Sequence, residues 1–125
     1  MAQSLVKMYT HIIFSTKHRQ KLINKSIKSD LQAYLIGVNT NSGSYTYEIY
    51  AHYDHIHIFC LLPKTICISD FLNKIKVSSS KWLKTKGLKN FAWQNGYAAF
   101  SVSPTKMDSV KKMSDSAVDM EENSF

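Results

Sequence analysis

The stretch that decides the fold is YDHIHIFCLL, residues 53–62, which is followed directly by Pro63. Its dense isoleucine, phenylalanine and leucine content, closed by a proline, predicts a β-strand. Side chains alternate between the two faces of a strand, so His55 and His57 are expected on one face, about 6.6–6.8 Å apart along the backbone. The opposite face carries side chains suited to a hydrophobic core, namely Ile56, Ile58 and Cys60.

The pair His55 and His57 is a candidate metal site, because two imidazoles that converge from one face can hold a single ion. An imidazole inside a protein is costly unless it has a partner. The spacing alone fits half-exposed or hydrogen-bonded histidines equally well, and two ligands do not complete a metal site. Both interpretations stay open at this point.

The composition predicts one globular domain over residues 1–125. Apolar residues make up 44% and aromatic residues 12% of the chain, which excludes a disordered protein. Cys60 and Cys67 have neither a metal-type spacing nor the number needed for a disulfide framework, which favours a reducing compartment. There is no run of eighteen apolar residues and no signal-peptide core. We therefore expect a cytoplasmic protein that does not enter a membrane.

The charge is unevenly distributed along the chain. Residues 1–112 contain all sixteen lysines and arginines against five acidic residues, a net charge of +11. Residues 113–125 contain four acidic residues and no basic one, a net charge of −4. A basic body predicts a polyanionic partner, most commonly nucleic acid. The alternative is an ordinary lysine-rich surface that serves solubility.

The order of predicted elements indicates the fold class. Strands are expected at residues 8–16, 45–51, 53–62 and 97–102, and helices at 25–40 and 69–84, with Asn24 as the N-cap of the first helix. Ser103-Pro104 predicts the start of an additional C-terminal helix. This order predicts an α+β ferredoxin-like sandwich, βαββαβ, with a four-stranded antiparallel sheet and two helices on one face. The first and third strands are then central neighbours, which places His11 beside the histidine pair if the register allows.

Two further patterns concern surfaces. In the strand 45–51, strict alternation would place Tyr45, Tyr47 and Ile49 on one face. A basic loop follows the first strand, and lysines line the second helix opposite its apolar side. The candidate nucleic-acid contacts are Lys17, Arg19, Lys74, Lys76, Lys81 and Lys84.

Four segments together resemble the small single-tyrosine transposases of insertion sequences, including the REP-associated tyrosine transposases. The resemblance spans residues 9 to about 112, and the ordered set is specific although each segment alone is weak. It rests on YTHIIFSTKHR (9–19), on DHIH (54–57), which is similar to the HUH motif of that family, on IKVSSSKW (75–82), and on WQNGYAAFSVS (93–103).

The resemblance implies a dimeric transposase that acts on single-stranded DNA hairpins. It implies that His55 and His57 hold a divalent ion, Mg²⁺ or Mn²⁺, which polarises the scissile phosphate. A tyrosine on the C-terminal helix would attack that phosphate, forming a 5′-phosphotyrosine link and releasing a 3′-hydroxyl.

The chain departs from that family at the C-terminal helix. Met113 stands where the nucleophilic tyrosine is expected, and Ala117 stands where a glutamine completes the metal site. A thioether cannot attack phosphate. In one interpretation the chain keeps its fold and DNA binding but has lost cleavage; in the other, Tyr50 or Tyr53 supplies the nucleophile. The residues do not decide whether this chain is an active enzyme.

Other classes of function also fit some of these features. The same sandwich serves RNA-recognition domains, which display aromatic rings on their central strands. A non-catalytic module that binds a DNA hairpin or RNA is therefore an alternative. A metal-dependent hydrolase of small substrates is less well supported, because no pair of acid/base carboxylates accompanies the histidines.

Overall fold

The computed structural model describes residues 9–63 and 65–102, and its elements follow the predicted order. These are β1 (Tyr9–Ser15), the short 3₁₀ turn η1 (Lys17–Arg19), α1 (Lys25–Asn41), β2 (Tyr45–Ala51), β3 (His55–Leu61), α2 (Ile68–Thr85) and β4 (Ala98–Val102). The predicted C-terminal helix, with Met113 and Ala117, lies outside the described residues. No helix in the described part is both long and apolar enough to span a bilayer.

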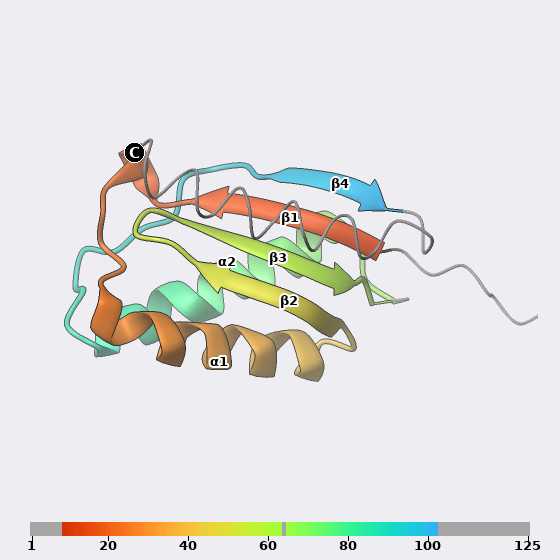
Figure 1. The fold of residues 1–125 in the computed structure, drawn as a ribbon, viewed down its shortest axis with the longest axis horizontal. Coiled ribbons are helices and arrows are strands. Elements are labelled where there is room, and N and C mark those ends of the chain that lie inside the picture. Colours follow the sequence, from red (N-terminus) through yellow and green to blue (C-terminus); the bar gives the residue numbers. More distant parts are fainter. Residues whose placement is uncertain (1–8, 64, 103–125) are drawn as a thin grey trace, which may run out of the picture.

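The four strands form one antiparallel sheet in the order β2-β3-β1-β4. Helices α1 and α2 both pack on the same face of this sheet (Figure 1). Strands β1 and β3 are the central neighbours, which confirms the ferredoxin-like arrangement predicted from the order of elements.

The core lies between the sheet and the two helices. Ile12 and Phe14 of β1 and Ile56 and Ile58 of β3 point toward the helices, and none is more than 2% exposed. The helices meet them with buried side chains at helical spacing, namely Leu31, Leu35, Phe71, Leu72, Ile75 and Leu83. Burying each of these large side chains is worth about 1.5–3 kcal/mol, so this face of the sheet fixes the fold.

The helix ends match their sequence signals. The side chain of Asn24 accepts a hydrogen bond from the Ile27 amide at 3.1 Å, which confirms the predicted N-cap of α1. After α2, Gly87 adopts a φ of +103°, a conformation that glycine reaches without strain.

Strand β2 departs from the alternation predicted for it. The register against β3 shifts between Thr46 and Glu48, so the strand contains a β-bulge there. Tyr47 packs against Phe59 on the face away from the helices, whereas Ile49 pairs with Ile58 and packs against the core. The prediction that Ile49 shares a face with Tyr45 and Tyr47 is wrong, because the extra residue of the bulge reverses the alternation beyond it.

Candidate functional site

His55 and His57 lie on the sheet face that the two helices leave uncovered. Their rings face each other, with 3.1 Å between the two Nε2 atoms and 4.9 Å between ring centroids. Both side chains are buried, at 2% and 3% exposure. The prediction that they share a face is therefore confirmed, and the structure adds that their Nε2 atoms converge.

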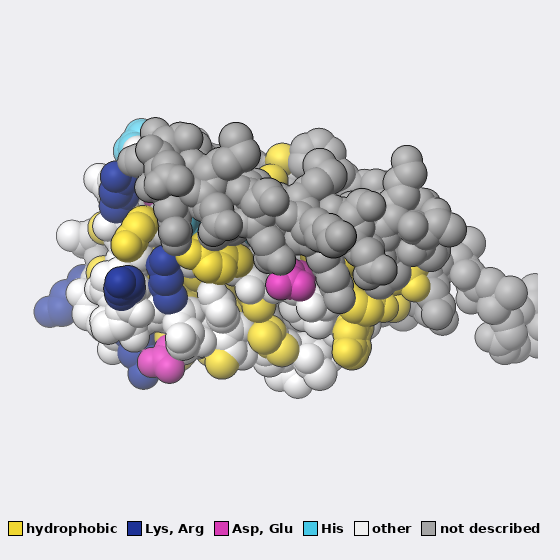
Figure 2. Space-filling model, viewed as in Figure 1, with side chains coloured by type: hydrophobic (Ala, Val, Ile, Leu, Met, Phe, Trp, Pro, Cys, Tyr) yellow, Lys and Arg dark blue, Asp and Glu magenta, His cyan; other side chains and the backbone are white. Residues whose placement is uncertain are grey.

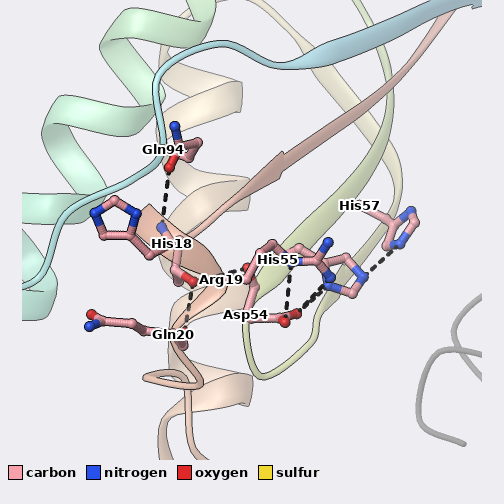
Figure 3. Close-up of polar contacts among 8 residues, drawn as sticks. His18, Arg19, Gln20, Asp54, His55, His57 and Gln94 are labelled. Carbon is pink, nitrogen blue, oxygen red and sulfur yellow. Dashed lines mark hydrogen bonds and ion pairs between the residues drawn. The ribbon is translucent and has the colours of Figure 1, made fainter. Parts of the chain in front are cut away.

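Behind His55 lies a carboxylate that fixes the orientation of its ring. Asp54 Oδ1 accepts a hydrogen bond from His55 Nδ1 at 2.6 Å, which turns Nε2 toward His57. Arg19, carried by η1, holds Asp54 from the other side, through Nε at 3.2 Å and Nη2 at 3.3 Å. Figure 3 shows these four side chains following one another in the order Arg19, Asp54, His55, His57.

The charge of Asp54 is stabilised where it lies. Burial by itself would raise the pKa of this carboxyl, but the hydrogen bonds from His55 and Arg19 and their charges together lower it below its usual value. Asp54 is therefore ionised at neutral pH. An ionised carboxylate behind a histidine is the arrangement that commonly orients metal-binding imidazoles in proteins.

A third histidine continues the series. His11 pairs with Phe59 in the register of β1 and β3, and its Nε2 lies 3.4 Å from His57 Nδ1. This confirms that His11 lies beside the pair. Burial and the neighbouring His57 lower the pKa of His11 to about 4, so its ring is neutral near pH 7.

When the three rings are neutral, their contacts allow one chain of hydrogen bonds. His55 Nδ1 donates to Asp54, His55 Nε2 can then accept from His57 Nε2, and His57 Nδ1 can accept from His11 Nε2. Holding an ion at both Nε2 atoms requires His57 to carry its proton on Nδ1 instead. The neutral His11 can then act as the acceptor.

The spacing of the two nitrogens fits ligands of one ion. Imidazole nitrogens bind divalent ions at about 2.0–2.1 Å, so two of them at adjacent coordination positions lie about 3 Å apart. The Nε2 atoms of His55 and His57 meet this condition. Within residues 9–63 and 65–102, no set of three or more histidine, cysteine or acidic side chains is arranged to hold a metal.

The predicted nucleic-acid contacts divide between two regions. Lys17 and Arg19 lie exposed in η1, and Arg19 reaches Asp54, the hydrogen-bond partner of His55. Figure 2 shows Lys and Arg side chains gathered at the left end of the view, over η1 and the start of α1. Residues 17–28 carry five of them without an acidic residue, namely Lys17, Arg19, Lys21, Lys25 and Lys28.

The other candidates lie on α2, on the helical side of the sheet and away from the histidines. Lys74, Lys81 and Lys84 are exposed. Lys76 instead turns to the loop before β4, where its ammonium donates to the carbonyl oxygens of Gln94 and Gly96 at 2.9 and 2.5 Å. Its charge therefore holds that loop in place. Of the six candidates, the structure links Arg19 to the histidine pair, through Asp54.

Comparison with known proteins adds the family to this geometry. The chain matches, over residues 4–113, the family model described as "Transposase IS200 like". The chain belongs to the IS200-like transposase family. This confirms the family expected from the four sequence segments.

Solved structures of other proteins share this fold. A "putative transposase" from Deinococcus radiodurans R1 is similar at a TM-score of 0.70 and 19% identity, over 93% of this chain and 95% of that one. A REP-associated tyrosine transposase bound to a REP hairpin is similar at a TM-score of 0.58 and 20% identity, over 85% of this chain and 63% of that one. A comparison with curated proteins gave no match.

The tyrosines considered as replacement nucleophiles for an IS200-like transposase lie near the histidines in different settings. Tyr50 pairs with His57 across β2 and β3, but its hydroxyl lies 3.3 Å from the Lys28 ammonium of α1, at the edge of the sheet. Tyr53 lies in the turn before β3, with the same ammonium 4.5 Å from its ring centroid. Lys28 thus draws the Tyr50 hydroxyl toward α1.

Sequence reasoning overlooked the role of Asp54, which it quoted only as part of a motif. Its position next to His55 was a usable signal, because adjacent acidic and imidazole groups can hydrogen-bond in a turn. Its second partner, Arg19, is 35 residues away in the chain. Only the tertiary fold brings these two together.

Proposed function

We propose that this IS200-like transposase binds single-stranded DNA that folds into hairpins, and that His55 and His57 hold a divalent ion, Mg²⁺ or Mn²⁺, against the DNA backbone. The observation that carries the proposal is the convergence of the two Nε2 atoms, with the ring of His55 oriented by Asp54. When bound, the ion would neutralise charge on a phosphate oxygen. The basic side chains near η1 would hold the neighbouring phosphates.

We also propose that this chain binds DNA but does not cleave it as its family does. The proposal rests on Met113 and Ala117, which stand where the resemblance places a tyrosine and a glutamine. Neither a thioether nor a methyl group can attack phosphate or bind Mg²⁺. By the same resemblance, the chain would act as a homodimer, which light scattering at several protein concentrations would test. Its cysteine content favours a reducing compartment such as the cytoplasm.

An RNA-binding module is less well supported by the sheet surface. Such modules stack bases on exposed aromatic rings of the central strands. Here Phe14 belongs to the core, and Phe59 shares its face of β3 with His55 and His57. The central strands present histidines instead, which suits phosphate chemistry better than base stacking.

Hairpin binding can be tested by gel shift at a stated salt concentration. We expect tighter binding to a DNA hairpin with single-stranded flanks than to an RNA hairpin of the same sequence. The matched variants Lys17→Ala and Lys74→Ala separate the two basic regions, because Lys17 lies in η1 with Arg19 and Lys74 lies on α2. Equal or tighter binding to the RNA hairpin would overturn the proposal that DNA is the partner of this chain.

Loss of cleavage can be tested separately. After incubation of the protein with labelled hairpin DNA and Mn²⁺, we expect no covalent adduct on a denaturing gel. The double variant Met113→Tyr with Ala117→Gln is expected to form one, and adding His57→Ala to it should abolish that adduct. An adduct formed by the unmodified chain would overturn the proposed loss of cleavage. Tyr50 and Tyr53 would then be the candidate nucleophiles.

A further inference from the structure

Next to the histidine pair lies a cavity of about 260 Å³. Its floor is formed by Ile13 and Ala98, which pair across β1 and β4 on the same sheet face as the histidines. His55 and Arg19 form one side, and the loop Gln94–Tyr97 forms the other. His55 therefore belongs both to the histidine pair and to the wall of this cavity.

The loop that forms the outer wall is held on several sides. The Gln94 amide donates to the Ser15 carbonyl at 2.8 Å, and the Gln94 side-chain oxygen accepts from the His18 amide at 3.1 Å (Figure 3). Lys76 binds the carbonyl oxygens of Gln94 and Gly96. His18 and Arg19 both adopt positive φ, at 58° and 55°, which is uncommon for these residue types. The hydrogen bonds of Gln94 and Lys76 therefore fix the position of the loop beside the cavity.

The side chains around the cavity offer three kinds of contact. Tyr97 is 41% exposed, which leaves its ring accessible for stacking. Asn95 is exposed, and its amide can both donate and accept hydrogen bonds, as the edge of a base requires. Arg19 adds positive charge, because its side chain is 47% exposed although two of its nitrogens bind Asp54. Proteins that bind single-stranded nucleic acid use aromatic rings for stacking and cations for the backbone. The cavity offers both, together with an amide and an apolar floor.

From these contacts we infer that the cavity takes one unpaired base of the bound DNA strand, the base next to the phosphate held at the histidines. Its volume lies just below the roughly 300–1,000 Å³ typical of ligand pockets, which suits one base better than a longer segment. Tyr97 stacks on the base, and Asn95 reads its edge. This inference rests on the proposed function, because it takes the histidines as the place of the phosphate.

The inference is tested with DNA hairpins that carry the fluorescent base 2-aminopurine at successive positions of the single-stranded flank. We expect a fluorescence change on binding at one position, and Tyr97→Ala to remove it and weaken binding about 5- to 100-fold. Asn95→Ala should reduce the preference for one base at that position. The matched controls are Tyr45→Ala and Asn41→Ala, which alter exposed residues outside the cavity and should leave both readouts unchanged.

Two outcomes separate this inference from the proposed function. If the unmodified chain binds the hairpin but Tyr97→Ala and Asn95→Ala behave like their controls, the base site is overturned and hairpin binding stands. If the unmodified chain binds no hairpin, the four deoxynucleoside monophosphates are titrated against it and followed by NMR. Shifts of the Asn95 side-chain amide and the Gly96 amide would then support a base site, and their absence would overturn it.

Discussion

The two faces of strand β3 are almost equally buried, yet they carry opposite chemistry. Ile56 and Ile58 are fully buried against the helices, while His55 and His57 are 2% and 3% exposed on the other face. The isoleucines are stabilised by removal of apolar surface from water, at about 25 cal/mol per Å². The histidines need partners instead, because a buried polar group without a hydrogen bond destabilises the fold.

The comparison shows that burial alone does not separate a core from a site. What separates them is the kind of neighbour: Ile58 contacts other apolar side chains, whereas His55 contacts Asp54 and His57. A substitution on each face should therefore disturb a different property. The isoleucine face should govern stability, and the histidine face should govern the response to metal.

The largest expected effect is on stability. Ile58→Ala removes a fully buried side chain and should lower the free energy of unfolding by about 2–5 kcal/mol, measured by urea denaturation. The variant should still be stabilised by Mn²⁺, by about 2.7 kcal/mol at a hundred times the dissociation constant. His57→Ala should lose the stabilisation by Mn²⁺ completely. If both variants respond equally to Mn²⁺, the ion does not bind between His55 and His57.

A smaller effect is expected at the carboxylate behind the histidines. Asp54→Asn keeps the shape of the side chain but removes the charge that Arg19 and His55 hold, and should lower Mn²⁺ affinity about 10- to 100-fold by calorimetry. Asp30→Asn, an exposed carboxylate on α1, is the matched control. Equal Mn²⁺ affinity in both variants would show that Asp54 does not orient a metal ligand.

Asp54→Asn and the unmodified chain should also differ in the pH dependence of their stability. The pKa of Asp54 is lowered in the folded chain, so its contribution to stability is complete above the unfolded pKa and is lost as the pH falls through the folded pKa. Thermal midpoints measured from pH 7 down to pH 3 should therefore decrease more steeply for the unmodified chain than for Asp54→Asn. Parallel profiles would contradict the charge pairing.

How much the sequence predicts also differs between these regions. The alternation of β3 and the helical spacing of α2 predict which side chains enter the core, because periodicity acts locally. The β-bulge between Thr46 and Glu48 contains no glycine or proline, the residues that most often mark such an irregularity in a sequence. The alternation therefore assigns Ile49 to the wrong face.

For the site, the sequence predicts the histidine pair and the basic turn but not their connection. Arg19 reaches Asp54 only because β1 and β3 are paired and η1 follows β1. Lys76 turns to the loop before β4 because the carbonyl groups of Gln94 and Gly96 lie within its reach. Contacts of this kind depend on segments distant in the chain, so a single sequence does not reveal them.

The smallest expected effect on stability comes from substituting a cysteine. The chemical reactivity of the two thiols shows whether the core face of β3 is closed in the native chain. Cys60 lies on that face of β3, and burial raises its pKa to about 11, whereas Cys67 is exposed before α2. In the native chain at pH 8, a thiol reagent should therefore modify only Cys67, and Cys60 should react once urea is added. Cys67→Ser should abolish native labelling and raise stability by no more than about 1 kcal/mol, since serine is a favoured N-cap. Equal labelling of both thiols in the native chain would mean that the core face of β3 opens readily, and the contrast between its two faces would then lose its structural basis.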